Sequence, residues 1–126
     1  MSRTASIGMD SVFEIGLTLP DVEESPYYGA RALKLNGQMV ACTPLNKSAE
    51  ANSVVVAMSF ERRAALLVKT PSIYYITDHY APHPTMLIRL SKISRAELER
   101  TLRIARDFAA SQGAVRRSSS GKVKRR

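Results

Sequence analysis

Apolar residues recur at helical spacing in three stretches of the chain, and this pattern predicts three amphipathic helices. The first covers about residues 11–19, where Ser11 and Glu14 have the spacing of a capping box. The second follows Ser59, whose hydroxyl can cap its first turn. It closes at Pro71, because proline cannot continue a helix.

The third predicted helix has the most regular pattern. It begins at Ser94, which forms a second capping box with Glu97, and Gly113 is a typical stop at its end. The charged residues lie opposite an apolar stripe made of Leu98, Leu102, Ala105 and Ala109. We therefore expect this helix to pack one face on a core and to expose the other.

Between the helices, apolar and polar residues alternate as they do in half-buried strands. Asn36-Gly37 separates two such segments and favours the type I′ turn of a β-hairpin. Val54-Val55-Val56 is a β-branched run, which is typical of a strand. The sequence thus predicts five strands, at about residues 31–35, 38–43, 53–58, 73–77 and 85–93.

The resulting order of elements, α-β-β-β-α-β-β-α, predicts an α+β fold in two layers. Because most strands are linked as hairpins, we expect an antiparallel five-stranded sheet with the helices on one face. The other face would then be open to solvent or covered by a partner. The expected core residues are Val12, Ile15, Leu19, Leu33, Leu35, Val55, Leu67, Ile88, Leu98, Leu102 and Ala105.

Length and composition fit one domain that is held by its own core. The chain has 126 residues, of which 44% are hydrophobic, and we place the domain at residues 10–111, after a flexible leader at residues 1–9. Cys42 is the single cysteine, so an internal disulfide is excluded and a reducing compartment is expected. No apolar run approaches the roughly 20 residues that span a bilayer. These features predict a cytoplasmic protein without a membrane partner.

The net charge of +8 is concentrated at the C-terminus. Residues 112–126 contain no acid and no apolar period, and they are predicted to be a disordered tail. This segment contains six basic residues: Arg116, Arg117, Lys122, Lys124, Arg125 and Arg126. Without them, residues 1–111 have a net charge of only +2. Such a tail attracts polyanions, so we expect weak, sequence-independent binding of nucleic acid. A tail that only promotes solubility is the alternative.

Four segments resemble, in the same order, motifs of the MmcQ/YjbR-like family. Leu19–Glu24 is similar to the Leu-Pro-Gly-Val-Glu-Glu after the family's first helix, and Tyr28-Gly29 with Ala32–Leu35 is similar to its first hairpin. Thr77–Tyr80 and Leu87–Leu90 are similar to its Thr-Pro-His-Tyr and Val-Leu-Val-Arg-Leu segments. The residues that match the family motifs are Pro20, Glu23, Tyr28, Gly29, Lys34, His79, Tyr80 and Arg89.

This resemblance implies a fold similar to that of type III secretion chaperones, and it implies a DNA-binding role. It also implies an alternative, in which the domain is a protein-interaction or chaperone-like module, as a homodimer or with another protein, through its open sheet face. The chain departs from the family pattern at Ala81-Pro82-His83, where a glycine is usual, and in its basic tail.

Catalytic or metal-binding chemistry is not predicted. Cys42 and His79 are the one nucleophile–imidazole pair to consider, but Cys42 lies in an apolar strand, where a free cysteine is usually buried. His79 and His83 are four residues apart in a proline-containing loop, and no cysteine or carboxylate pair completes a metal site. The chain has neither a Walker loop nor a dinucleotide glycine fingerprint. We therefore expect a protein that is not an enzyme and that uses no metal or cofactor.

Aromatic and basic residues are interleaved in the second half of the chain, as they are on surfaces that bind nucleic acid. The tyrosines are Tyr74, Tyr75 and Tyr80. The same pattern is typical of a core tyrosine beside an amphipathic surface residue, and we favour that interpretation. The basic residues of the domain that would add to binding, if they share a face, are Lys34, Arg62, Arg63 and Arg89.

Overall fold

The computed structural model describes the backbone of residues 7–124 and the side chains of residues 7–112. Most of the predicted leader lies outside the described residues, and the first helix begins at Met9. In chain order the elements are α1 (Met9–Gly16), β1 (Val22–Glu24), β2 (Ala32–Leu35), β3 (Gln38–Cys42), β4 (Ser53–Ala57), α2 (Phe60–Lys69), β5 (Tyr74–Tyr75), β6 (Thr85–Arg89) and α3 (Arg95–Lys124).

The strands form one antiparallel sheet in the order β1-β2-β3-β4-β6-β5. The predicted α+β class and antiparallel sheet are confirmed, but the sheet has six strands and not five. The additional strand is β1, which pairs Val22 with Leu35 of β2. It has a single apolar residue, too few to produce an alternating pattern. The predicted hairpin turn is present, with positive φ angles of 49° at Asn36 and 83° at Gly37.

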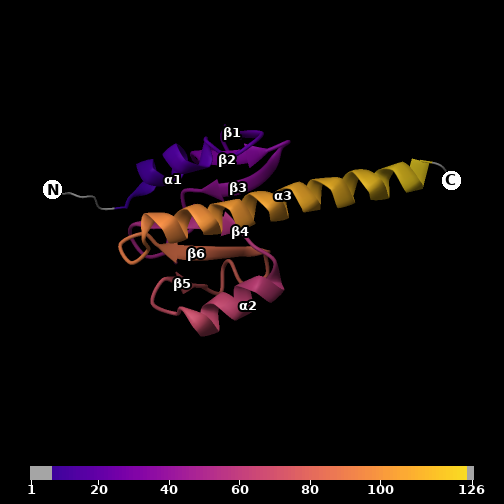
Figure 1. Cartoon of the computed structure of the whole chain (residues 1–126). Coiled ribbons are helices and arrows are strands. Elements are labelled where there is room, and N and C mark those ends of the chain that lie inside the picture. Colours follow the sequence, from indigo (N-terminus) through magenta and orange to yellow (C-terminus); the bar gives the residue numbers. More distant parts are fainter. Residues whose placement is uncertain (1–6, 125–126) are drawn as a thin grey trace.

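One face of the sheet carries the main core, beneath α1 and α3. Figure 1 shows both helices on the same side of the sheet, with α3 crossing its central strands. Leu33 and Val40 of the sheet are buried there against Leu98 and Leu102 of α3. Of the expected core residues, Leu67 alone is only half-buried. It belongs to α2, which lies beside β5 and β6 at the sheet edge and has no fully buried residue.

The hydroxyl caps predicted for the second and third helices are confirmed. Ser59 accepts from the backbone N–H of Arg62 (3.1 Å), and Ser94 accepts from that of Glu97 (3.1 Å). The capping box predicted at Ser11 is wrong, because the helix starts earlier and Gly8 occupies the capping position. Ser11 instead accepts from the Gly8 N–H at 3.2 Å. A side chain at the third helical position can reach back in this way to the backbone N–H of the capping residue.

The end predicted for the third helix is wrong. α3 passes through Gly113 and continues to Lys124, so the segment expected to be disordered has a helical backbone as far as that residue. One glycine in a helix interior costs only about 1 kcal/mol, which is too little to stop a helix by itself. Figure 1 shows α3 extending well beyond the sheet.

The second face of the sheet is largely covered by the chain itself. Ala32, Cys42, Val55 and Leu87 are paired across four neighbouring strands and form a second buried cluster, capped by Tyr80. Half-buried side chains pack over it: Tyr27, Met39, Ala49, Tyr75 and Ile76. They belong mainly to loops, which the sequence could not assign to a face. The expectation of a solvent-exposed face is therefore wrong in part: the chain buries five residues there, but Met39, Cys42 and Val55 of this face also line a hollow.

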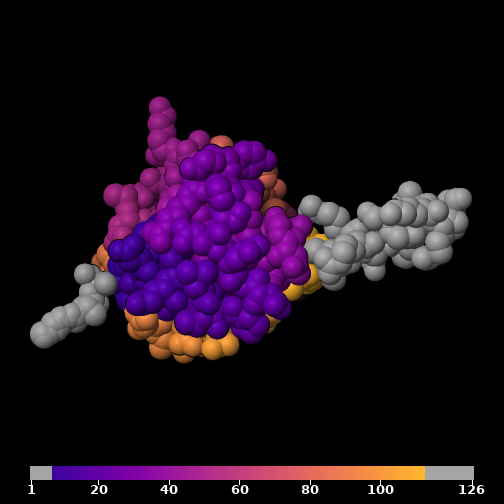
Figure 2. Space-filling view, turned by 90° about the horizontal axis from the view of Figure 1, so that it is seen from above, coloured from indigo at the N-terminus to yellow at the C-terminus, as the bar shows by residue number. Residues whose placement is uncertain are grey.

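The N-terminal part of the chain forms one continuous surface. Figure 2 shows the segment from α1 to β3, in indigo to purple, covering most of the face that is seen from above.

In the part of the chain that the structure describes, no helix is long and apolar enough to cross a membrane.

Candidate functional site

A hollow of about 550 Å³ lies over part of the second face of the sheet and reaches one of its ends. At this end β3 and β6 begin and β4 ends, and α3 passes by on its way beyond the sheet. Six of its lining residues carry aromatic rings: Tyr27, Tyr28, His79, Tyr80, His83 and Phe108. Among the described residues that line it, none is an aspartate, glutamate, lysine or arginine. We refer to this hollow as the aromatic pocket.

A tight turn presents the first two rings of the aromatic pocket. Tyr27 and Ala30 exchange two backbone hydrogen bonds of 2.9 and 3.0 Å, which leaves Tyr28 and Gly29 as the two central residues of the turn. Both have positive φ angles, 52° and 82°. Glycine adopts this conformation freely, whereas an ordinary L-residue such as tyrosine pays about 1–2 kcal/mol for it. Tyr28 is nevertheless 83% exposed, and its ring contacts that of Tyr27 edge to face, with centroids 4.7 Å apart.

His79 and Tyr80 form the opposite wall. Their rings meet edge to face, with centroids 4.8 Å apart. The Tyr80 hydroxyl accepts from the backbone N–H of Asn46 (3.1 Å), which fixes the buried ring. This wall and the Tyr28 turn are far apart in the sequence, yet both line the aromatic pocket. Three of the family-motif residues, Tyr28, His79 and Tyr80, therefore converge at one site.

Arg63 of α2 holds the loop behind this wall. Its guanidinium donates to the carbonyls of Ala81 (3.0 Å), His83 (2.9 Å) and Thr85 (3.1 Å). It also lies 4.9 Å from the centre of the Phe60 ring. Because these donors are directed into the protein's own backbone, Arg63 acts as a clamp on the loop and not as a free phosphate ligand.

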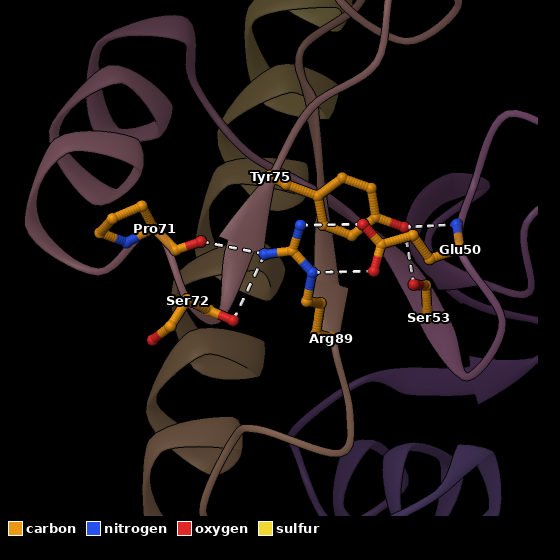
Figure 3. Close-up of polar contacts among 6 residues, drawn as sticks. All are labelled: Glu50, Ser53, Pro71, Ser72, Tyr75 and Arg89. Atoms are coloured by element: carbon orange, nitrogen blue, oxygen red, sulfur yellow. Dashed lines mark hydrogen bonds and ion pairs between the residues drawn. The ribbon is translucent and has the colours of Figure 1, made fainter.

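The guanidinium group of Arg89 also forms its hydrogen bonds within the protein (Figure 3). Its Nε and Nη2 each donate to a carboxylate oxygen of Glu50 at 2.8 Å, and Nη1 donates to the carbonyls of Pro71 (2.9 Å) and Ser72 (3.3 Å). The guanidinium lies over the Tyr75 ring, 4.4 Å from its centre. The same hydrogen bonds lower the pKa of the Glu50 carboxyl. Arg89 thus ties together β6, the start of β5 and the loop before β4.

The remaining basic residues of the predicted interface do not share a face. Lys34 lies on β2, next to one edge strand, with Nζ 5.8 Å from the centre of the Tyr27 ring. Arg62 is exposed on α2, beside the opposite edge of the sheet. At opposite edges of the sheet, these two cations are not brought together, and their contribution to binding stays a prediction. The side chains of Arg116, Arg117, Lys122, Lys124, Arg125 and Arg126 lie outside the described residues, so their role stays a prediction.

Cys42 lines the aromatic pocket together with His79, which is the arrangement that a thiol catalyst would need. The cysteine is only 3% exposed, and burial raises the pKa of its thiol to about 11. The thiol is therefore protonated at neutral pH and is a poor nucleophile. His79 and His83 both line the aromatic pocket, but the described residues contain no group of three or more potential metal ligands.

The aromatic pocket itself could not be found from the sequence. Phe108 is the only aromatic residue of α3, and its position resembles one more turn of an amphipathic helix. Tyr27 could not be predicted either, because it lies in a loop, where apolar residues follow no helical or strand periodicity. No family model matches the chain, and none of the curated proteins searched is a significant match. The resemblance to the MmcQ/YjbR-like family therefore stays a prediction.

Proposed function

We propose that the protein binds nucleic acid without sequence specificity, through the basic extension of α3. The observation that carries this proposal is the position of the cationic segment. α3 continues to Lys124 past the end of the sheet, and residues 113–126 contain six basic residues and no acid. A helix that leaves the domain can lie along a phosphate backbone without steric interference from the rest of the fold.

Most arginines of the folded domain are paired with carboxylates, and the net charge of residues 1–111 is only +2. Along α3, Arg95 pairs with Glu14, Arg100 with Glu97 and Arg103 with Glu99. Arg106 contacts Asp107 and Asp21, and Arg31 contacts Asp10 and Glu24. Carboxylates beside these guanidinium groups would repel phosphates. The charge that attracts a polyanion is therefore concentrated in the extension.

The extension is expected to bind weakly and by charge alone. With no feature that reads base edges in a duplex, the dissociation constant should be about 10⁻⁴–10⁻⁶ M at physiological salt. Each phosphate that the extension neutralises should contribute about −0.9 to the slope of log K against log salt concentration.

A variant in which all six basic residues of the extension are replaced by glutamine tests the proposal. Glutamine is a good helix former, so α3 should keep its helical tendency while it loses the charge. We expect this variant to lose most of the affinity for a random duplex and most of the salt dependence, as measured by fluorescence anisotropy. The matched control is Arg62→Gln with Lys34→Gln, which removes two domain cations and should leave the salt slope nearly unchanged. Equal binding by the six-glutamine variant and the wild type would refute the proposal, as would a wild type that fails to bind at low salt.

We also infer that the protein is a binding module and not an enzyme, because the one candidate nucleophile is buried and protonated. At pH 8, a rise of the thiol pKa from 9.0 to about 11 lowers the thiolate fraction of Cys42 roughly 100-fold. We expect a disulfide reagent to label the native protein at least about 100-fold more slowly than the urea-unfolded protein. Labelling of the native protein as fast as a free thiol would contradict this inference. A Cys42→Ser variant supplies the unlabelled baseline.

A further inference from the structure

We propose that the aromatic pocket holds one unstacked base of a single-stranded nucleic acid while the extension of α3 binds the neighbouring phosphates. This inference rests on the proposed function and names the form of nucleic acid that the protein prefers. Proteins that bind single strands combine a basic surface with aromatic side chains on which bases stack.

The lining of the aromatic pocket fits a base and not a phosphate. Exposed or half-exposed rings of Tyr27, Tyr28, His79 and Phe108 face a volume of about 550 Å³, which is within the usual range for small-ligand sites. No charged side chain is among the described residues of the lining. A neutral, planar group can stack on these rings, whereas an anion would find no counter-charge inside.

The same helix connects the aromatic pocket to the basic extension. Gln112 of α3 lines the pocket, and Arg116 follows one turn further along the helix backbone. Four residues of α-helix correspond to roughly 6 Å along the axis. The phosphates next to a base in the pocket would therefore lie close to the point where the extension of α3 begins.

The strained turn is a second, independent sign of a ligand. Asn-Gly is the usual pair at the centre of such a turn, yet this chain has tyrosine in the first position, where φ is 52°. The residue remains 83% exposed, and its ring meets that of Tyr27 edge to face, with centroids 4.7 Å apart. Strain that is retained for one exposed aromatic contact at the rim of a pocket points to a role in binding. Tyr28 is placed to close over a base in the aromatic pocket.

This arrangement predicts a preference for single strands, because the bases of a duplex are already stacked and paired. The direct test compares a short oligothymidylate with an oligonucleotide of equal length and charge in which the sugars are abasic. The extension meets the same phosphates in both, and the aromatic pocket meets a base in only one. We expect the wild type to bind the oligothymidylate about 5- to 150-fold more tightly, as one stacked base allows.

Two variants locate this difference in the aromatic pocket. Tyr28→Asn removes the ring and suits the positive φ, so we expect it to abolish most of the preference while raising Tm by roughly 3–6 °C. His79→Ala should reduce the preference as well. The control is Val68→Asn on α2, which removes an equally exposed apolar side chain (83%) outside the pocket and should change nothing.

The possible outcomes separate this inference from the proposed function. If the wild type binds both oligonucleotides equally but the six-glutamine variant binds neither, the extension binds nucleic acid and the aromatic pocket does not. If the wild type prefers the oligothymidylate and Tyr28→Asn retains that preference, the base is held elsewhere and the inference is wrong. If the wild type binds neither at low salt, both proposals are wrong.

Discussion

Replacing Leu102 by alanine is expected to lower the free energy of unfolding by about 2–5 kcal/mol. Leu102 is 0% exposed and packs on the sheet from the N-terminal part of α3. Removing its isobutyl group leaves a cavity between the helix and the strands, which a close-packed interior cannot fully fill. Urea denaturation followed by circular dichroism measures the change, and the slope of the transition should stay the same because the fold is retained.

The matched control for this cavity is Arg103→Ala on the next residue of α3. Arg103 is exposed and pairs with Glu99 on the helix surface, so its loss should have a small effect. If Leu102→Ala were no more destabilising than Arg103→Ala, this result would contradict the packing of Leu102 between α3 and the sheet.

Replacing Tyr74 by phenylalanine is expected to cost about 1.5–3 kcal/mol, although it removes a single oxygen atom. Tyr74 is 1% exposed, and its hydroxyl donates to Glu97 Oε2 at 2.6 Å and lies 2.8 Å from the Thr101 hydroxyl. Phenylalanine would leave a partly buried carboxylate and a buried hydroxyl without this partner. When a buried polar group is left without a hydrogen bond, the loss of stability exceeds the net contribution of that hydrogen bond to folding. Thermal and urea denaturation of both proteins measure the difference.

The destabilisation caused by Tyr74→Phe should depend on pH. The Tyr74 hydroxyl first, and Arg100 second, hold the pKa of the Glu97 carboxyl below its ordinary value. A carboxyl with a lowered pKa stabilises the fold above its ordinary pKa, and this stabilisation is lost as the pH falls through the pKa of the folded state. The difference between the two proteins should therefore be constant near neutral pH and shrink in acid below about pH 4. A difference that grows on acidification would contradict the assignment.

Periodicity and capping patterns predicted the main core and two helix caps, but not the partners of polar groups that are distant in the sequence. Leu98 and Leu102 could be placed because a helical stripe has one orientation that buries it. For Glu97 the sequence indicated a capping box, yet its carboxylate bonds to Tyr74 and Arg100. The hydrogen bond to Tyr74 forms because β5 lies beside the first turns of α3. The two residues are 23 positions apart, so no local sequence pattern predicts their contact.

The candidate site shows the same limit more strongly. Arg89 matches a family motif and has the residue type of a phosphate ligand, but its donors are used by Glu50 and two backbone carbonyls. The aromatic pocket is assembled from a turn, a loop and a helix that are distant in sequence. Tyr28 and His79 were noted as motif residues, and nothing in their spacing showed that they line one hollow.

The short outer strands of the sheet have a consequence for self-association. β1 has three residues, two of which are the exposed acids Glu23 and Glu24, and β5 has only two residues. Strands at the border of a sheet recruit further strands through free backbone groups, and brevity and charge are the usual defences against such growth. Two copies of this chain are therefore poorly equipped to join border to border into a continuous sheet. The same feature should keep the protein free of amyloid-like polymerisation at the high local concentrations that binding along a nucleic acid produces.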